Sequence, residues 1–255
     1  MRPPVVALLG LGEAGSRLAA DLEAAGADVR GYDPDGEAGA DLPGRKSEPG
    51  TAVAGAEIVL SVNSGRAALG AATAARPALR PGVLYADLNT APPELKRELA
   101  ALVEPARFAD VALLGPVPSR GLGTPALASG AGAHAFADSL RSLGMPVEVV
   151  SGTPGDAATF KLLRSVFMKG LAAAAIESLD AAEAAGHAEW LRGEIAGVIG
   201  QPFLDRLLEG SRRHAARRVD ELEAAQALLV ELGIEPRIAS ATAALLTDLG
   251  KARAR

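Results

Sequence analysis

The chain of 255 residues has a formal net charge of −5, and hydrophobic residues make up 49% of it. This length allows one large domain or two modest ones, while the acidic balance disfavours nucleic acids and anionic membranes, which attract concentrated basic surfaces. The chain has no Cys, which excludes disulfides, thiolate metal sites and a cysteine nucleophile, and we expect no bound metal.

The first segment is the short apolar run Val5–Leu9, which lacks the basic region and cleavage site of a signal peptide. Nowhere does an apolar run reach the roughly 18 residues that a membrane span requires. These features predict a cytoplasmic protein that acts on a small molecule and not on nucleic acid or a membrane.

Short apolar runs then alternate with helical patterns over residues 1–152. The runs that we predict to be strands cover residues 5–9, 27–32, 57–62, 83–88, 107–113 and 147–150. Such alternation indicates βαβ units, because neighbouring parallel strands need a crossover connection. We therefore predict an α/β Rossmann domain with a mostly parallel, doubly wound sheet over residues 1–152.

The pattern changes after the turn at residues 152–155, and no strand pattern follows. Residues 156–185 repeat apolar side chains at helical spacing and predict one long helix that ends near Gly186. Further helices are predicted at residues 188–199, 202–209, 215–232 and 238–249. Residues 153–255 are thus expected to form an all-α domain that begins with a long interdomain helix, completes a substrate cleft and forms a homodimer.

A glycine pattern lies between the first predicted strand and the first predicted helix. It fits G-x-G-x-x-G and reads Gly10-Leu11-Gly12-Glu13-Ala14-Gly15. The first glycine permits a tight turn, the second lets the backbone approach a pyrophosphate, and the third lets helix and strand pack closely. The helix N-terminus then offers N–H groups and partial positive charge to the phosphates. The pattern predicts a dinucleotide site, and a glycine-rich turn without a ligand is the alternative.

Asp33 follows the second predicted strand, close to the spacing of about 20 residues expected for a carboxylate that binds the adenosine ribose. A carboxylate there repels a 2′-phosphate, so we favour NAD over NADP. NADP stays open because Arg30, Arg45 or Lys46 can pair with a phosphate from nearby. Asp33 is also compatible with a simple turn residue at residues 33–36.

Three later segments complete a family pattern. Residues 87–92 read Asp-Leu-Asn-Thr-Ala-Pro, residues 108–130 contain Asp110, Gly115 and Gly123, and residues 155–165 contain Lys161. Together with the glycine pattern, they resemble the segments D-x-S-T-x-P, D-A-P-V-S-G-G and G-x-G-x-x-x-K-x-x-N-N of the β-hydroxyacid dehydrogenase family, which includes 3-hydroxyisobutyrate and 6-phosphogluconate dehydrogenases. The resemblance covers nearly the whole chain and implies a hydride transfer between a nicotinamide cofactor and a hydroxy acid.

The same segments depart from the family pattern where substrate is bound. Asn89 replaces a Ser, Leu114 and Pro116 replace a Ser and a Gly, and Arg164 and Ser165 replace two Asn. We therefore expect a divergent subfamily whose substrate contacts differ from those of typical members, and the resemblance does not name the substrate or the direction of the reaction.

Lys161 is the predicted acid/base, because hydride transfer at a carbinol carbon must be matched by proton transfer at its oxygen. A solvated surface lysine is the alternative. Lys161, Arg164, Ser165 and Lys169 share one helix face with Met168. This face suits an anionic substrate if it lines a cleft, and it is otherwise a solvated basic stripe.

The resemblance and the glycine pattern together predict two sets of site residues. Those expected to bind the cofactor are Gly10, Leu11, Gly12, Glu13, Ala14, Gly15, Asp33, Val62, Asn63 and Asn89. Those expected to bind substrate are Asn89, Thr90, Gly115, Pro116, Arg120, Arg164, Ser165 and His214. Two other functions stay open. One is an imine or other C=N reductase of the same architecture, and the other is a dinucleotide-binding sensor without turnover.

Overall fold

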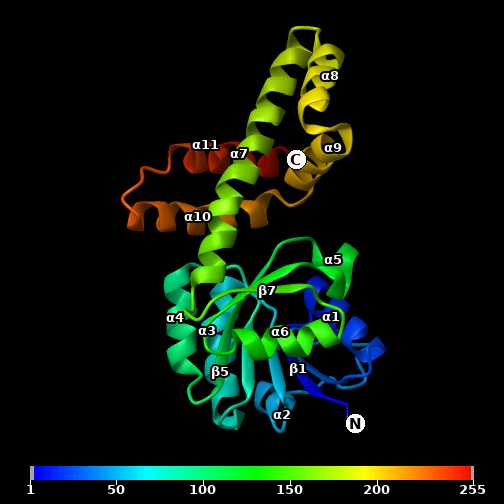
Figure 1. The fold of residues 1–255 in the computed structure, drawn as a ribbon. Coiled ribbons are helices and arrows are strands. Elements are labelled where there is room, and N and C mark those ends of the chain that lie inside the picture. Colours follow the sequence, from blue (N-terminus) through cyan, green and yellow to red (C-terminus); the bar gives the residue numbers. More distant parts are fainter. Residues whose placement is uncertain (1–2, 254–255) are drawn as a thin grey trace. The chain divides into compact units, whose positions relative to one another are not determined.

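The computed structural model describes residues 3–253 as two compact units, the first ending at Lys161 and the second beginning at Leu162. Helix α7 (Asp156–Ala184) starts in the first unit and continues into the second (Figure 1). The sequence placed the boundary before this helix, between residues 152 and 153. The structure divides within the helix because the first turn of α7 is hydrogen-bonded to the sheet of the first unit.

The first unit is built on a seven-stranded sheet in the order β2-β1-β3-β4-β5-β6-β7. The strands are β1 (Val5–Leu9), β2 (Asp28–Tyr32), β3 (Ile58–Ser61), β4 (Leu84–Asp87), β5 (Arg107–Leu113), β6 (Ala126–Ser129) and β7 (Val147–Ser151). Neighbouring strands are parallel except for the antiparallel pair β5 and β6. The carboxyl ends of β1 to β5 therefore share one edge, and the predicted α/β Rossmann fold is confirmed.

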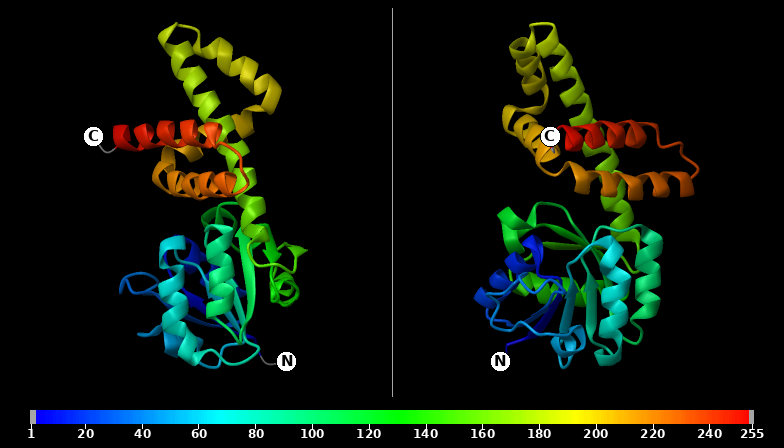
Figure 2. Two further views of the ribbon diagram at one scale, coloured as in Figure 1. Left: turned by 90° about the vertical axis from the view of Figure 1, so that its left-hand side faces the viewer. Right: turned by 180° about the vertical axis from the view of Figure 1, so that it is seen from behind.

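Helices cover both faces of this sheet (Figure 2). They are α1 (Glu13–Ala24), α2 (Pro49–Val53), α3 (Gly65–Ala75), α4 (Pro93–Leu102), α5 (Val117–Arg120) and α6 (Ala133–Ser142), with single 3₁₀ turns at Arg76–Ala78 and Gly121–Gly123. Residues of β1 alternate between two apolar cores, because successive side chains of a strand point to opposite faces. Leu8 packs in the core with Leu18 of α1, and Leu9 packs in the core with Leu99 of α4.

Strand β6 is absent from the strands that the sequence predicts. Its four residues Ala126–Ser129 read Ala-Leu-Ala-Ser, without the β-branched and aromatic side chains that favour strands. Pairing with β5 and β7 forms it instead, with Asp110 of β5 opposite Ser129. The tertiary contacts override a weak local preference.

In the described part of the second unit every element is a helix, as predicted. The helices after α7 are α8 (Ala188–Ile199), α9 (Gln201–Arg213), α10 (Ala215–Glu231) and α11 (Arg237–Arg253). One core joins α7 to α9 through Ile176 and Leu204, and another joins α10 to α11 through Leu222 and Leu246. Among residues 3–253, no helix combines the length and apolar character needed to cross a membrane.

A buried ion pair ties α7 to α10 within the second unit. Lys169 is 6% exposed, and its Nζ atom lies 2.7 Å from Oε2 of Glu221. Burial lowers the pKa of Lys169, Glu221 opposes this shift, and Arg218 and Arg217 reinforce it. Lys169 is therefore engaged by Glu221 and does not extend a uniform basic stripe along α7.

We expect the Lys169→Met variant to lose part of the rise in stability that the wild type shows at alkaline pH. Since the folded pKa of Lys169 lies below the unfolded value of about 10.4, the unfolded state binds more protons between these two values. The free energy of unfolding of the wild type therefore rises with pH across that window, by about 1.4 kcal/mol for each unit of pKa difference. Urea denaturation at several pH values up to about 10.4 measures the slope.

The matched control is Lys251→Met, because the Lys251 side chain is 70% exposed. This variant should keep the wild-type slope. Identical slopes in the wild type and in Lys169→Met would contradict the assignment.

Candidate functional site

The glycine turn connects β1 to α1 at the carboxyl edge of the sheet. Gly10 has a φ of +110°, which side chains with a Cβ rarely adopt, and a Cβ there would collide with the backbone carbonyl of Val62. A Cβ on Gly15 would collide with the carbonyl oxygen of Gly10, whereas a Cβ on Gly12 would meet nothing within 4 Å. The fold thus requires Gly10 and Gly15, while the space beside Gly12 is open.

This turn fits the pyrophosphate of a dinucleotide. The open space beside Gly12 lies at the N-terminus of α1, whose first N–H groups have no acceptors within the helix, and no side chain caps it. Beside the turn, Oδ1 of Asn63 is buried, and no donor in the described part of the chain faces it. The backbone N–H groups at the start of α1 are therefore the donors that suit a pyrophosphate, whereas the Asn63 oxygen is an acceptor and suits an N–H or O–H group.

Asp33 is held against the glycine turn by backbone hydrogen bonds. Its Oδ2 atom accepts from the N–H of Leu11 at 2.7 Å, and its Oδ1 atom accepts from the N–H of Asp35 at 2.9 Å. The guanidinium of Arg45 donates to the carbonyl oxygens of Ala38, Asp33 and Asp35. Arg45 therefore fastens the loop after β2, and the Asp33 carboxylate is fixed beside the glycine turn. Its contact with a ribose stays a prediction.

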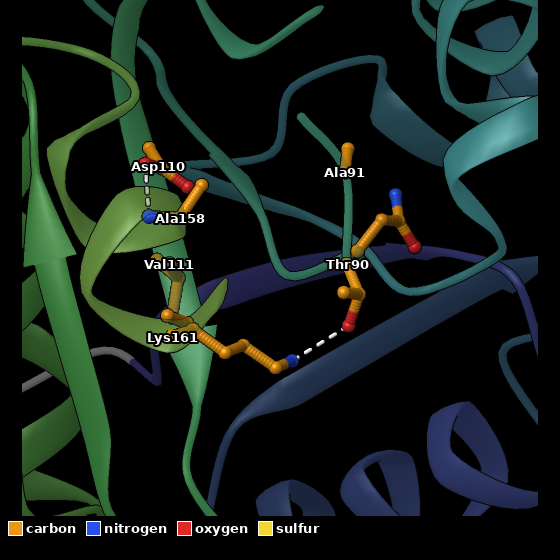
Figure 3. Close-up of a pocket in the computed structure, with 8 residues that line it drawn as sticks. Thr90, Ala91, Asp110, Val111, Ala158 and Lys161 are labelled. Carbon is orange, nitrogen blue, oxygen red and sulfur yellow. Dashed lines mark hydrogen bonds between the residues drawn. The ribbon is translucent and has the colours of Figure 1, made fainter. Parts of the chain in front are cut away.

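A small pocket lies where β4 and β5 end (Figure 3). The Lys161 side chain reaches across it from α7, and its Nζ atom donates to Oγ1 of Thr90 at 2.6 Å. The residues that line the pocket are Asn89, Thr90, Ala91, Asp110, Val111, Ala112, Ala158 and Lys161. The structure thus brings Lys161 next to Asn89 and Thr90, although 71 residues separate Lys161 from Thr90 in the chain.

Asn89 connects this pocket to the glycine turn. Its Oδ1 atom accepts from the N–H of Asn63 at 2.7 Å, and its Nδ2 atom donates to Oγ of Ser61 at 2.9 Å. The Nδ2 atom of Asn63 in turn donates to the carbonyl oxygen of Leu9, at the end of β1. The amide of Asn89, where the family pattern has Ser, is therefore used to join the ends of β1, β3 and β4.

A buried charge cluster that the sequence analysis missed lies next to the pocket. The Nζ atom of Lys96 lies 2.6 Å from Oδ2 of Asp87 and 3.1 Å from Oδ1 of Asp110, and none of the three side chains is more than 1% exposed. Burial alone would lower the pKa of Lys96, but the two carboxylates outweigh it and raise the pKa. Lys96 therefore stays charged inside the first unit.

The sequence carries a signal for a buried Lys96 in the spacing of helix α4. Pro93, Lys96 and Leu99 of α4 are spaced by three residues and are all buried, so the lysine interrupts the apolar face of an amphipathic helix. A buried lysine needs carboxylate partners, and Asp87 and Asp110 both end or interrupt apolar strands in the family-like segments.

Asp110 also holds the start of α7. Its Oδ2 atom accepts from the N–H groups of Gly155 at 3.1 Å and Ala158 at 3.0 Å, and Oγ of Ser129 accepts from the N–H of Ala157 at 3.0 Å. These acceptors satisfy N–H groups that a helix leaves without partners at its start, and the carboxylate is favoured by the helix dipole. Lys161 follows in the next turn.

The predicted substrate loop after β5 is anchored to α1. Asp21 accepts from the N–H of Leu122 at 2.9 Å, and Arg17 donates to the carbonyl oxygen of Pro118 at 3.1 Å. The exposed Arg120 lies over Gly115, and Pro116 is exposed beside them. The loop is thus held in place, and its contacts with substrate stay a prediction.

Three predicted substrate residues belong to the second unit. Arg164 is exposed on α7, Ser165 is buried on the same helix, and His214 lies between α9 and α10. Their roles also stay predictions.

Two family models match the chain. The model described as the NAD binding domain of 6-phosphogluconate dehydrogenase matches residues 5–138. A domain of unknown function (DUF1932) matches residues 182–249. The first match covers strands β1 to β6, the glycine turn and the segment with Asn89 and Thr90.

Two similar solved structures span both units, and a further relative matches part of the chain. A conserved protein of unknown function, described as structurally similar to 3-hydroxyacid dehydrogenases, is 31% identical, with 98% of each chain covered and a TM-score of 0.78. The 3-hydroxyisobutyrate dehydrogenase of Mycobacterium tuberculosis, solved with L-serine, is 21% identical, with 98% of this chain and 94% of that chain covered and a TM-score of 0.84. An uncharacterized 28.5 kDa protein in the 7S RNA 5′ region of Methanothermus fervidus is 27% identical over 156 residues. That match covers 60% of this chain and 61% of the relative, less than two thirds of its length.

The geometry of the glycine turn predicts that one glycine-to-alanine substitution destabilises the protein and that a second, nearby one does not. Gly15→Ala should lower the free energy of unfolding by roughly 3 kcal/mol, because the new Cβ meets the carbonyl oxygen of Gly10. Gly12→Ala should leave the stability close to that of the wild type, because its Cβ enters open space. Urea denaturation of the three proteins measures both effects, and equal destabilisation by the two substitutions would contradict the geometry.

Proposed function

Because this chain belongs to the family of the 6-phosphogluconate dehydrogenase NAD-binding domain, as a divergent member of the β-hydroxyacid dehydrogenase-like family, we propose that it is an NAD(P)-dependent oxidoreductase. The reaction is hydride transfer between nicotinamide and a small, anionic hydroxy acid. The observation that carries this proposal is the hydrogen bond from Lys161 to Thr90 in a pocket at the edge that also bears the glycine turn.

The cofactor would be held by the glycine turn and the first turn of α1 at its pyrophosphate and by Asp33 at its adenosine ribose. When bound, it supplies the hydride acceptor or donor. The engagement of Arg45 by three carbonyl oxygens supports NAD over NADP, since that guanidinium is already used to hold the loop. Asn63 and Asn89 complete the wall between the turn and the pocket.

Lys161 moves the proton at the substrate oxygen. An ammonium has three N–H donors, so Lys161 can keep its bond to Thr90 while it donates to the carbonyl oxygen during reduction, or it can accept the hydroxyl proton when neutral during oxidation. Thr90 fixes the direction of the amine. This pairing favours a hydroxy acid over the C=N reductase and the sensor considered from the sequence.

A homodimer through the helical unit, in the cytoplasm, is part of this proposal. It is supported by exposed apolar side chains on α7 and α8, where Phe167 is 69%, Trp190 66% and Val198 85% exposed. Light scattering should give twice the mass of one chain.

Titration with NADH and NADPH, followed by the fluorescence of the nucleotide, tests the cofactor site. The wild type should bind NADH more tightly, and Asp33→Asn should improve NADPH binding by about tenfold, because the repelling charge is lost while an acceptor oxygen for the N–H of Leu11 is kept. Binding of neither nucleotide by the wild type would overturn the proposed function.

Substitution of Lys161 tests the chemistry. Lys161→Met should lower kcat for the hydroxy acid by about 10²- to 10⁴-fold, because the proton then lacks a positioned acid/base, and it should leave NADH binding intact. A screen of small hydroxy acids for turnover by the wild type identifies the substrate for this measurement. Lys251→Met serves as the control. Unchanged kcat in Lys161→Met would remove the lysine from the mechanism.

A further inference from the structure

The Lys96 ammonium is paired with two carboxylates inside the first unit. It donates to the carbonyl oxygen of Asp87 at 3.0 Å and to Oδ2 of Asp87 at 2.6 Å, and it lies 3.1 Å from Oδ1 of Asp110. With 1% of its surface exposed, Lys96 cannot touch a substrate. Any effect on the reaction must pass through the two carboxylates.

The Asp87 carboxylate supports the segment that bears Thr90. The Oδ1 atom of Asp87 accepts from Nδ2 of Asn89 at 2.5 Å, and Thr90 is the next residue of the chain. This segment is held against the strand ends by the bonds that Lys96 donates to Asp87, that Asn89 donates to Ser61 and that Asn63 donates to Asn89. The position of the Thr90 hydroxyl is therefore set by groups that Lys96 holds.

The Asp110 carboxylate supports the start of the helix that bears Lys161. The Oδ2 atom of Asp110 accepts from the N–H groups of Gly155 and Ala158, and Lys161 lies three residues after Ala158 on the same helix. Lys96 thus pairs with both carboxylates that support the 2.6 Å bond from Lys161 to Thr90. Asp87 supports the segment that bears Thr90, and Asp110 supports the helix that bears Lys161.

We propose that Lys96 is a positioning residue, which sets the Lys161 ammonium against Thr90 by bridging Asp87 and Asp110. Stability alone does not require this arrangement, because well-packed apolar residues often replace a buried ion pair at no loss of stability. The hydrogen bonds from Lys96 to Asp87 and its ion pair with Asp110 fix the registration of α7 on β4 and β5, which apolar packing would leave looser. The expected effect on turnover rests on the proposed function, whereas the placement of Lys161 does not.

Two variants and two readouts test this role. Lys96→Met removes the ammonium and leaves two unpaired carboxylates, which can prevent folding. The second variant therefore combines Lys96→Met with Asp87→Asn and Asp110→Asn, which removes the charges but keeps oxygens that can accept from Gly155 and Ala158. Trace acetylation at one pH, read by peptide mass spectrometry, gives the reaction rate of Lys161 relative to the exposed Lys251 without cofactor or substrate.

In the folded triple variant, Lys161 should be acetylated several-fold faster relative to Lys251, because its bond to Thr90 is loosened. The kcat should fall on the order of 100-fold, as expected for a misplaced acid/base, while the Kd for NADH stays unchanged. The control Lys251→Met lacks the reference lysine for acetylation and should keep the wild-type kcat and Kd. A folded triple variant with wild-type Lys161 reactivity overturns the proposal, and so does failure of that variant to fold, which would make the cluster a stability element. If the wild type binds no nicotinamide nucleotide, the proposed function fails, but the acetylation result still decides the role of Lys96.

Discussion

The Asp110 carboxylate accepts hydrogen bonds from the start of α7 while its other oxygen faces the Lys96 ammonium. The N–H groups that begin a helix need acceptors, and in a buried site water cannot supply them. Because β5 carries this carboxylate and α7 carries Lys161, one side chain fixes the start of the helix that bears Lys161 to the sheet. The neighbouring strand is tied in through Lys96 and Asp87.

The order of the strands explains why polar groups gather here. Parallel neighbours bring their carboxyl ends to one edge, and a crevice forms outside the sheet. Asn63 and Asn89 follow two adjacent strands at that edge, and their amides bridge from the end of β1 to the end of β4. The glycine turn and the Lys161 pocket are therefore parts of one hydrogen-bonded surface.

Local patterns predicted much of this arrangement. The glycine spacing located the turn, and the family-like segments brought out Thr90, Asn89 and Lys161, which the fold then places together. Strand β6 was missed because small residues carry little strand preference. Lys96 was missed because its role depends on two carboxylates, 9 and 14 residues away in the chain, that only the folded sheet brings close to it. The start of α7 was placed correctly, but its packing on the sheet depends on Asp110, which periodicity cannot reveal.

The loop after β2 has a consequence for how tightly a small molecule can bind. Arg45 closes this loop on three carbonyl oxygens, and the Asp33 carboxylate is already aimed by two backbone N–H groups. Ordering a mobile loop or a free side chain on association costs free energy that is subtracted from the affinity. Here that ordering is completed when the chain folds, so a ribose hydroxyl would meet an acceptor that has little conformational entropy left to lose.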